Sequence, residues 1–142
     1  MTHLVDTTIV SELVKENGEP RVLAWIRANE PDLYVSVAMF AELERGVHLM
    51  PAGRRRDAMA EWVRVDLRER FAARILPINE AVAAAWGMLM ARSKYQGAEL
   101  DPMDAFFAAT AAEHGLILAT RNIRHFEGLD LQLYNPWEPL RQ

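Results

Sequence analysis

Three acidic residues stand where their carboxylates could act together on one substrate. Asp6 directly follows a short apolar run, where a buried strand would pass into a helix. Glu42 lies about two turns into the helix that we expect after the second strand, and Asp104 lies in the first turn of a later helix. Each also has an ordinary structural role open to it, because acids cap helices, favour their N-termini and populate their exposed faces.

A hard divalent cation is the partner that three such carboxylates would need. If they converge, their repulsion raises the cost of ionising all of them, and a cation removes that cost. Oxygen ligands favour Mg²⁺ or Mn²⁺ over zinc. The chain has no cysteine, and its four histidines are not spaced as zinc ligands. A cation held in this way can orient a phosphodiester, activate water and stabilise the leaving oxygen.

A fourth polar group follows the fourth expected strand. The Asn122 side chain could accept a hydrogen bond from a metal-bound water, or it could hydrogen-bond to the backbone of a turn. Thr120 could cap a helix. His125 has no second histidine at metal-binding spacing, so we interpret it as a surface or turn residue.

The elements that position these residues are short strands separated by helices. Ser36, Asn79 and the pair Asp101-Pro102 mark helix starts, and Gly115 marks a helix end. Strands alternating with helices predict an α/β fold with a mainly parallel sheet, whose ligands bind beyond the carboxyl ends of the strands. The expected strands lie at residues 4–5, 33–35, 75–76, 116–118 and 131–134, and the expected helices at 36–49, 54–71, 79–91 and 101–114.

Composition limits the class of protein. The 142 residues are 51% hydrophobic and carry a net charge of −4, which fits one globular domain over residues 1–142. No run approaches the length of about 20 apolar residues that spans a bilayer, and Asp6 interrupts any signal-peptide core. We therefore expect a cytoplasmic protein with no membrane association.

Five segments, in order along almost the whole chain, carry a family resemblance: residues 4–13, 36–46, 104–111, 118–122 and 135–138. They resemble the PIN domain, specifically the VapC and FitB-like toxin ribonucleases of bacterial toxin–antitoxin pairs. The resemblance implies a three-layer α/β/α fold with a central parallel sheet of four to five strands. It also implies a partner antitoxin whose C-terminal segment lies across the active site, and a homodimer.

The resemblance further implies an endoribonuclease that depends on Mg²⁺ or Mn²⁺. The family's acids correspond to Asp6, Glu42 and Asp104 as metal ligands, and its fourth acid falls on Asn122, which adds no negative charge. We therefore expect one tightly held ion, with a second joining only when substrate phosphate supplies oxygens. The supporting residues expected are Thr7 and Thr120.

The distribution of the arginines is compatible with an RNA substrate despite the negative net charge. Eight arginines face four acids between Arg45 and Arg74, a local excess of positive charge. Arg54 and Arg55, together with Arg121 and Arg124, could follow an RNA backbone. A solvated helix face with ion pairs between neighbouring turns explains the segment equally well.

The residues around Asp6 exclude two other classes of phosphate-binding enzyme. A haloacid-dehalogenase-type phosphotransferase needs a second acid two residues after Asp6, where this chain has Thr8, and no Gly-rich phosphate loop follows the first strand. A stronger alternative is a catalytically degenerate PIN domain, with Asn122 marking the loss, that acts as a partner-binding or RNA-binding module.

Overall fold

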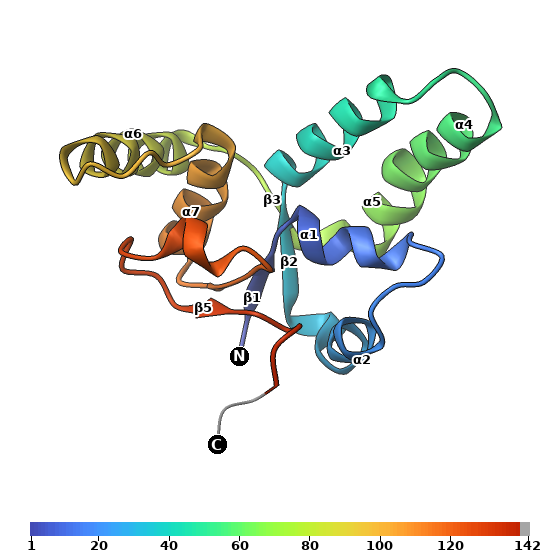
Figure 1. Ribbon diagram of the computed structural model, residues 1–142, viewed down its shortest axis with the longest axis horizontal. Coiled ribbons are helices and arrows are strands. Elements are labelled where there is room, and N and C mark those ends of the chain that lie inside the picture. Colours follow the sequence, from blue (N-terminus) through green and yellow to red (C-terminus); the bar gives the residue numbers. More distant parts are fainter. Residues whose placement is uncertain (140–142) are drawn as a thin grey trace.

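A computed structural model describes residues 1–139 of the chain as an α/β fold (Figure 1). Within those residues five strands form one parallel sheet in the order β3-β2-β1-β4-β5. The sheet lies between helices, with α6 and α7 on one side and α1, α2 and α5 on the other. The expected parallel sheet in an α/β/α arrangement is therefore confirmed.

The strands are short and mostly buried, as their uninterrupted apolar sequences predict. They are β1 (His3–Val5), β2 (Leu33–Ser36), β3 (Ile75–Leu76), β4 (Ile117–Ala119) and β5 (Leu133–Tyr134). β1 is central, since it pairs with β2 on one side and with β4 on the other. The segments that follow β1, β2 and β4 therefore begin at the same edge of the sheet.

Three of the main helices begin at residues that the sequence marks, whereas the helix over Pro20–Asn29 is not among those expected. Ser36 accepts a hydrogen bond from the Ala38 N–H, and Asn79 accepts one from the Val82 N–H. Gly115 ends a helix with a φ of 63°, a left-handed conformation that glycine adopts without steric cost. The helices are α1 (Thr7–Val10), α2 (Pro20–Asn29), α3 (Val37–Leu49), α4 (Arg54–Glu61), α5 (Leu67–Arg70), α6 (Glu80–Tyr95) and α7 (Pro102–His114).

The helical stretch expected over residues 54–71 contains a π-helical turn, η3 (Trp62–Asp66), between α4 and α5. Val63, Leu67 and Phe71 are buried along it at intervals of four residues. Short 3₁₀ turns complete the chain: η1 (Ser11–Leu13), η2 (Glu30–Asp32), η4 (Ala72–Arg74) and η5 (Ile123–Phe126). Within residues 1–139, no helix combines the length and apolar character that crossing a bilayer requires.

Small side chains allow α7 to pack closely against the centre of the sheet. Ala105, Ala108 and Ala111 are fully buried, and the Phe107 side chain is only 2% exposed. This packing fixes the start of α7, and with it Asp104, beside the carboxyl ends of the strands (Figure 1).

Asp101 caps α7, so its removal should loosen the turn that holds Asp104. Its Oδ1 accepts hydrogen bonds from the Met103 N–H (2.8 Å) and the Asp104 N–H (3.2 Å). We expect Asp101→Ala to lower the free energy of unfolding by about 1 kcal/mol in urea denaturation, whereas Asp101→Asn keeps the cap and most of the stability. Equal destabilisation by both substitutions would contradict the capping role.

Candidate metal-dependent active site

Asp6 is the most deeply placed of the three acids. Its side chain is only 6% exposed at the end of β1, and its backbone N–H donates to the Ala119 carbonyl at 3.2 Å. The Oδ1 atom accepts hydrogen bonds from the Thr8 N–H, at 3.0 Å, and from the Thr8 hydroxyl. Asp6 thus caps α1, while its carboxylate is held at the edge of the sheet.

Burial raises the pKa of Asp6 above its ordinary value, because desolvation disfavours the charged form. Hydrogen bonds from the Thr120 and Thr8 side chains oppose that rise. Among residues 1–139, no basic side chain forms an ion pair with Asp6. A cation beside this carboxylate would offset the cost of its burial.

Glu42 is joined to the first helix by a side-chain hydrogen bond. The Thr7 Oγ1 donates to the Glu42 Oε1 at 2.6 Å, linking the start of α1 to the second turn of α3. Thr7, which directly follows Asp6 in the sequence, therefore orients the Glu42 carboxylate.

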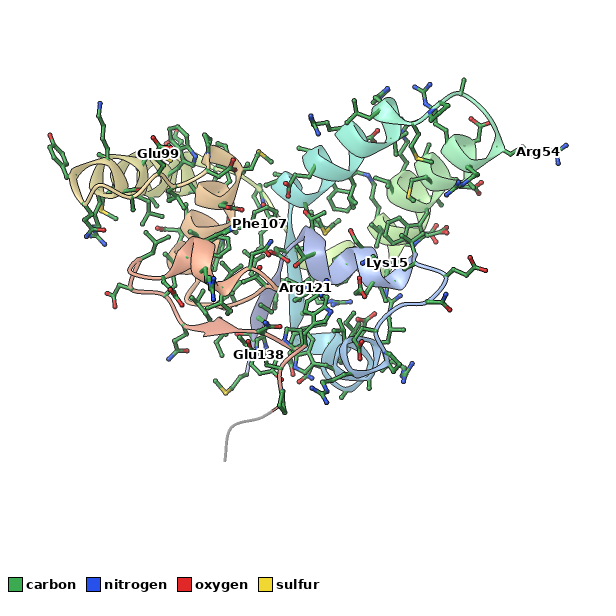
Figure 2. All side chains as sticks on the ribbon, viewed as in Figure 1. Lys15, Arg54, Glu99, Phe107, Arg121 and Glu138 are labelled. Carbon is green, nitrogen blue, oxygen red and sulfur yellow. The ribbon has the colours of Figure 1, made fainter. Side chains whose placement is uncertain are left out.

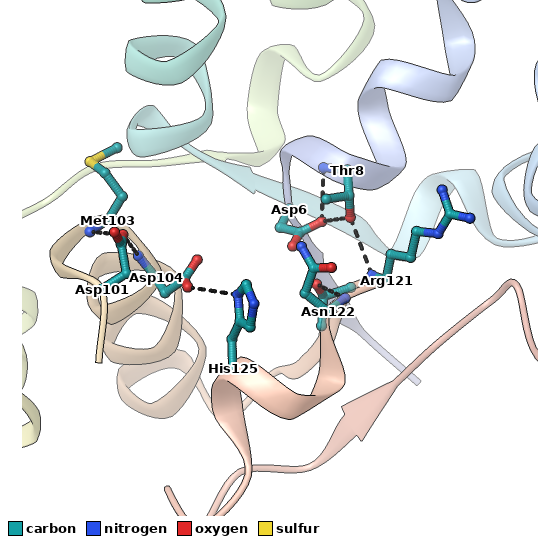
Figure 3. Close-up of polar contacts among 9 residues, drawn as sticks. Asp6, Thr8, Asp101, Met103, Asp104, Arg121, Asn122 and His125 are labelled. Carbon is teal, nitrogen blue, oxygen red and sulfur yellow. Dashed lines mark hydrogen bonds and ion pairs between the residues drawn. The ribbon is translucent and has the colours of Figure 1, made fainter. Parts of the chain in front are cut away.

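Asp104 lies against a histidine from the turn after β4 (Figure 3). Its Oδ2 is 3.1 Å from the Nδ1 of His125, within hydrogen-bonding distance. Partial burial raises the pKa of Asp104, and Asp101 adds to the rise, while His125 counteracts it. His125 is exposed, as expected, but its contact with Asp104 gives it a place in the site that the sequence does not indicate.

Two threonine hydroxyls connect the loop after β4 to Asp6. The Arg121 N–H donates to the Thr8 Oγ1 at 3.2 Å, and the Asn122 N–H donates to the Thr120 Oγ1 at 3.0 Å. Both hydroxyls in turn hydrogen-bond to the Asp6 carboxylate. The Asn122 side chain extends toward Asp6 (Figure 3). Thr120 is therefore a buried link between the loop and Asp6.

One cavity of about 370 Å³ is lined by Asp6, Glu42 and Asp104 together. Two adjoining hollows meet it, one sharing Asp104 and the other sharing Glu42. The acids therefore stand where three depressions of the surface join. Among the side chains lining the cavity are Asp6, Thr7, Thr8, Lys15, Glu42, Asp104, Arg121, Asn122 and Trp137.

The chemistry of this cavity fits a hard divalent cation. Four carboxylates and one amide line it. Glu12 pairs with Lys15, whereas the buried Asp6 has no basic partner in the described chain. Within residues 1–139, however, no three acidic or histidine side chains are already gathered as a metal site. Thr7 and His125 hold Glu42 and Asp104 separately, so an ion held by all three acids would replace or share those contacts.

The four proposed RNA-binding arginines divide into two groups. Arg121 lines the cavity, and Arg124 lines the adjoining hollow with Asp104. Arg54 and Arg55 open α4, and Figure 2 shows Arg54 at the tip of the arm formed by α3 and α4, far from Arg121.

The other arginines after Arg56 largely serve the fold. Arg64 pairs with Glu44 on α3 at 2.8 Å, and Arg70 pairs with Glu30 at 2.6 Å. The Arg74 guanidinium donates to the carbonyls of Glu30 and Leu33. These contacts join separate elements and are not pairs between neighbouring turns of one helix.

Comparison with known proteins now decides the family. The PIN domain family matches residues 3–130, most of the chain. The chain belongs to the PIN-domain family. It is 38% identical over 137 residues to the VapC ribonuclease Y4jK of Sinorhizobium fredii, covering 96% of this chain and 98% of that protein. It is also 36% identical over 135 residues to the toxin FitB of Neisseria gonorrhoeae, covering 94% and 97%.

Solved structures agree with this PIN-domain assignment. A FitAB complex bound to a DNA fragment matches with a TM-score of 0.90 at 32% identity, covering 99% of each chain. A chain of the FitAcB structure from Neisseria gonorrhoeae gives a TM-score of 0.89 at 34% identity, covering 97% of this chain and 100% of that one. The expected resemblance to VapC and FitB toxins is therefore confirmed.

Metal binding at the acids should stabilise the folded PIN domain. If the assembled site alone binds Mg²⁺, a concentration 100-fold above Kd adds about 2.7 kcal/mol to the free energy of unfolding. We expect a rise in melting temperature with Mg²⁺ for the wild type and little or none for Asp104→Ala, measured by calorimetry. Equal shifts in both proteins would place the ion elsewhere.

The raised pKa of Asp6 predicts a pH dependence of stability in the absence of metal. Because the folded state holds the proton more tightly than the unfolded state, stability falls as the pH rises from the ordinary aspartate pKa through the raised one. One group contributes at most about 1.4 kcal/mol per pH unit. In EDTA, urea denaturation should show a steeper decline in the wild type than in Asp6→Asn, which keeps only the decline caused by Asp104. Parallel curves for the two proteins would refute the assignment.

Proposed function

We propose that this PIN-domain protein is a divalent-metal-dependent endoribonuclease and the toxin of a toxin–antitoxin pair. The observation that carries the proposal is the shared cavity of Asp6, Glu42 and Asp104, in which the buried Asp6 carboxylate has no basic partner within residues 1–139. The similarity to a VapC ribonuclease over nearly the full length of both chains supports the choice of RNA as substrate.

In the proposed reaction each side chain has a distinct task. Asp6 and Asp104 would hold Mg²⁺ or Mn²⁺ directly, and Glu42 would hold or position a water molecule. The ion, when bound, supplies the positive charge that lowers the cost of nucleophilic attack on a phosphodiester. Water attacks phosphorus in line, the bond to the 3′ oxygen breaks, and the products carry 5′-phosphate and 3′-hydroxyl ends. The residues that orient this arrangement are Asn122, Thr7 and Thr120.

The amide at position 122 limits the number of ions. An Asn122 oxygen can accept a hydrogen bond or ligate weakly, but it brings no charge to balance a second cation. A single tightly held ion therefore accords with this donor set, with a second ion depending on substrate oxygens.

A protein antitoxin is the proposed partner, and a homodimer the proposed assembly. FitB has been solved as FitAB and FitAcB complexes, and this chain matches those structures along nearly its whole length. An antitoxin segment lying over the cavity would block the acids. The proposed place of action is the cytoplasm, where both RNA and a newly made antitoxin are present.

Cleavage of RNA by the purified protein tests the activity. We expect cleavage with Mg²⁺ or Mn²⁺, none in EDTA, and a loss of about 100-fold or more in Asp6→Asn and Asp104→Asn, since even groups that only orient metal ligands are worth 10- to 100-fold. Glu44→Gln is a matched control, because Glu44 lies on the same helix as Glu42 but pairs with Arg64.

The ends of the products separate this route from others. Fragments bearing 2′,3′-cyclic phosphate, formed equally well in EDTA, would exclude the proposed mechanism. If wild-type protein cleaves no RNA with either metal, yet still binds an antitoxin, the degenerate partner-binding alternative replaces the proposal.

A further inference from the structure

The segment at residues 135–138 has a structural role that the proposed reaction does not use. The Asn135 side chain bridges two parts of the chain: its Nδ2 donates to the Arg121 carbonyl at 3.4 Å, and its Oδ1 accepts from the Trp137 N–H at 2.9 Å. The Trp137 carbonyl in turn accepts from the Arg21 guanidinium at 3.0 Å. One amide therefore fixes Trp137 against the loop that carries Arg121.

The result is an arginine stacked on a tryptophan beside the acids. The Arg121 guanidinium carbon lies 5.1 Å from the centre of the Trp137 ring, and both side chains line the cavity of Asp6, Glu42 and Asp104. A guanidinium on an aromatic face keeps its plane fixed and leaves its N–H donors in that plane free. Stacking therefore restricts the Arg121 side chain before binding, so less conformational entropy is lost when a ligand binds it.

Arg121 is also the available cation of this cavity. Across residues 1–139, it forms no ion pair, whereas Lys15, the other basic residue of the cavity, pairs with Glu12. Burial disfavours the charge of Glu12, but hydrogen bonds from Lys15 and the Glu19 backbone, with the charges of Lys15 and Arg121, keep its pKa below the ordinary value. Lys15 is therefore bound directly to Glu12, whereas Arg121 acts on Glu12 only from a distance and keeps its N–H donors.

We infer that Arg121, held on Trp137, binds a backbone phosphate of single-stranded RNA next to the phosphate that is cleaved. The planar fork of a guanidinium matches a phosphate group and carries no base preference. An unpaired strand can place one phosphate at the acids and its neighbour at Arg121. Trp137 is a positioning residue, and Asn135 holds the pair together. This inference rests on the proposed ribonuclease function for the identity of the polymer.

A short fluorescent RNA tests this contact without requiring cleavage. The probe is a single-stranded hexanucleotide in EDTA, and its Kd is measured by anisotropy over a series of salt concentrations. We expect Arg121→Gln to weaken binding about 10-fold at low salt and to reduce the salt slope by about 0.7, the value for one phosphate contact on a single strand. Arg121→Lys should keep the slope and bind with intermediate affinity.

Substitutions at Trp137 distinguish stacking from charge. Trp137→Leu should weaken the hexanucleotide about 2- to 5-fold with an unchanged salt slope, and Trp137→Phe should restore most of the loss, because it keeps an aromatic face. Arg92→Gln is the matched control: Arg92 is an exposed arginine in the last turn of α6 and does not line the cavity, so binding of so short a probe should not change. Thermal unfolding of each variant checks that the fold is intact.

Several results would overturn the inference. These are undetectable binding by the wild type, an unchanged Kd in Arg121→Gln, or an equal loss in Arg92→Gln. The outcome is separable from that of the proposed function. Metal-dependent cleavage with an unaltered Kd in Arg121→Gln removes only the phosphate contact, whereas the expected Kd changes without any cleavage by the wild type leave the contact standing and remove the nuclease.

Discussion

The burial of one carboxylate at the end of the central strand is the constraint on which the site depends. β1 lies between β2 and β4, so Asp6 has protein on both sides and little contact with water. Ionising it there is unfavourable unless hydrogen-bond donors or a cation face it. The fold supplies the donors from Thr8 and Thr120, and among the described residues it supplies no basic side chain. The negative charge of the Asp6 carboxylate is therefore not balanced by a basic side chain of the described residues, and a divalent cation would balance it.

The sequence predicts the sheet and the positions of the acids because both follow from local signals. Uninterrupted apolar runs identify buried strands, and Ser36, Asn79 and Asp101 have side-chain oxygens that cap the helices they precede. Parallel strands then bring Asp6 and the starts of the following helices to one edge. Element order and local chemistry were sufficient for this part of the site.

The contacts of the acids could not be predicted, because they depend on tertiary packing. Nothing local indicates that Thr7 would reach across to Glu42, or that the turn after β4 would place His125 against Asp104. Likewise, the arginines of residues 54–74 show charge alternation in sequence, but only the packing of α3 and η2 against that segment decides their partners. The π-helical turn at Trp62–Asp66 also has no clear sequence signal.

The hydrogen bonds that join Asp6 to the loop after β4 through the Thr8 and Thr120 hydroxyls can run in only one direction. A backbone N–H can only donate, so the Thr8 and Thr120 hydroxyl oxygens accept from the N–H groups of Arg121 and Asn122. Each hydroxyl proton is then donated to the Asp6 carboxylate. If Asp6 were protonated, its neutral carboxyl group would be a poorer acceptor and both hydroxyl hydrogen bonds to it would weaken. The negative charge of Asp6 therefore strengthens the hydrogen-bonded connection between the end of β1 and the segment that bears Arg121.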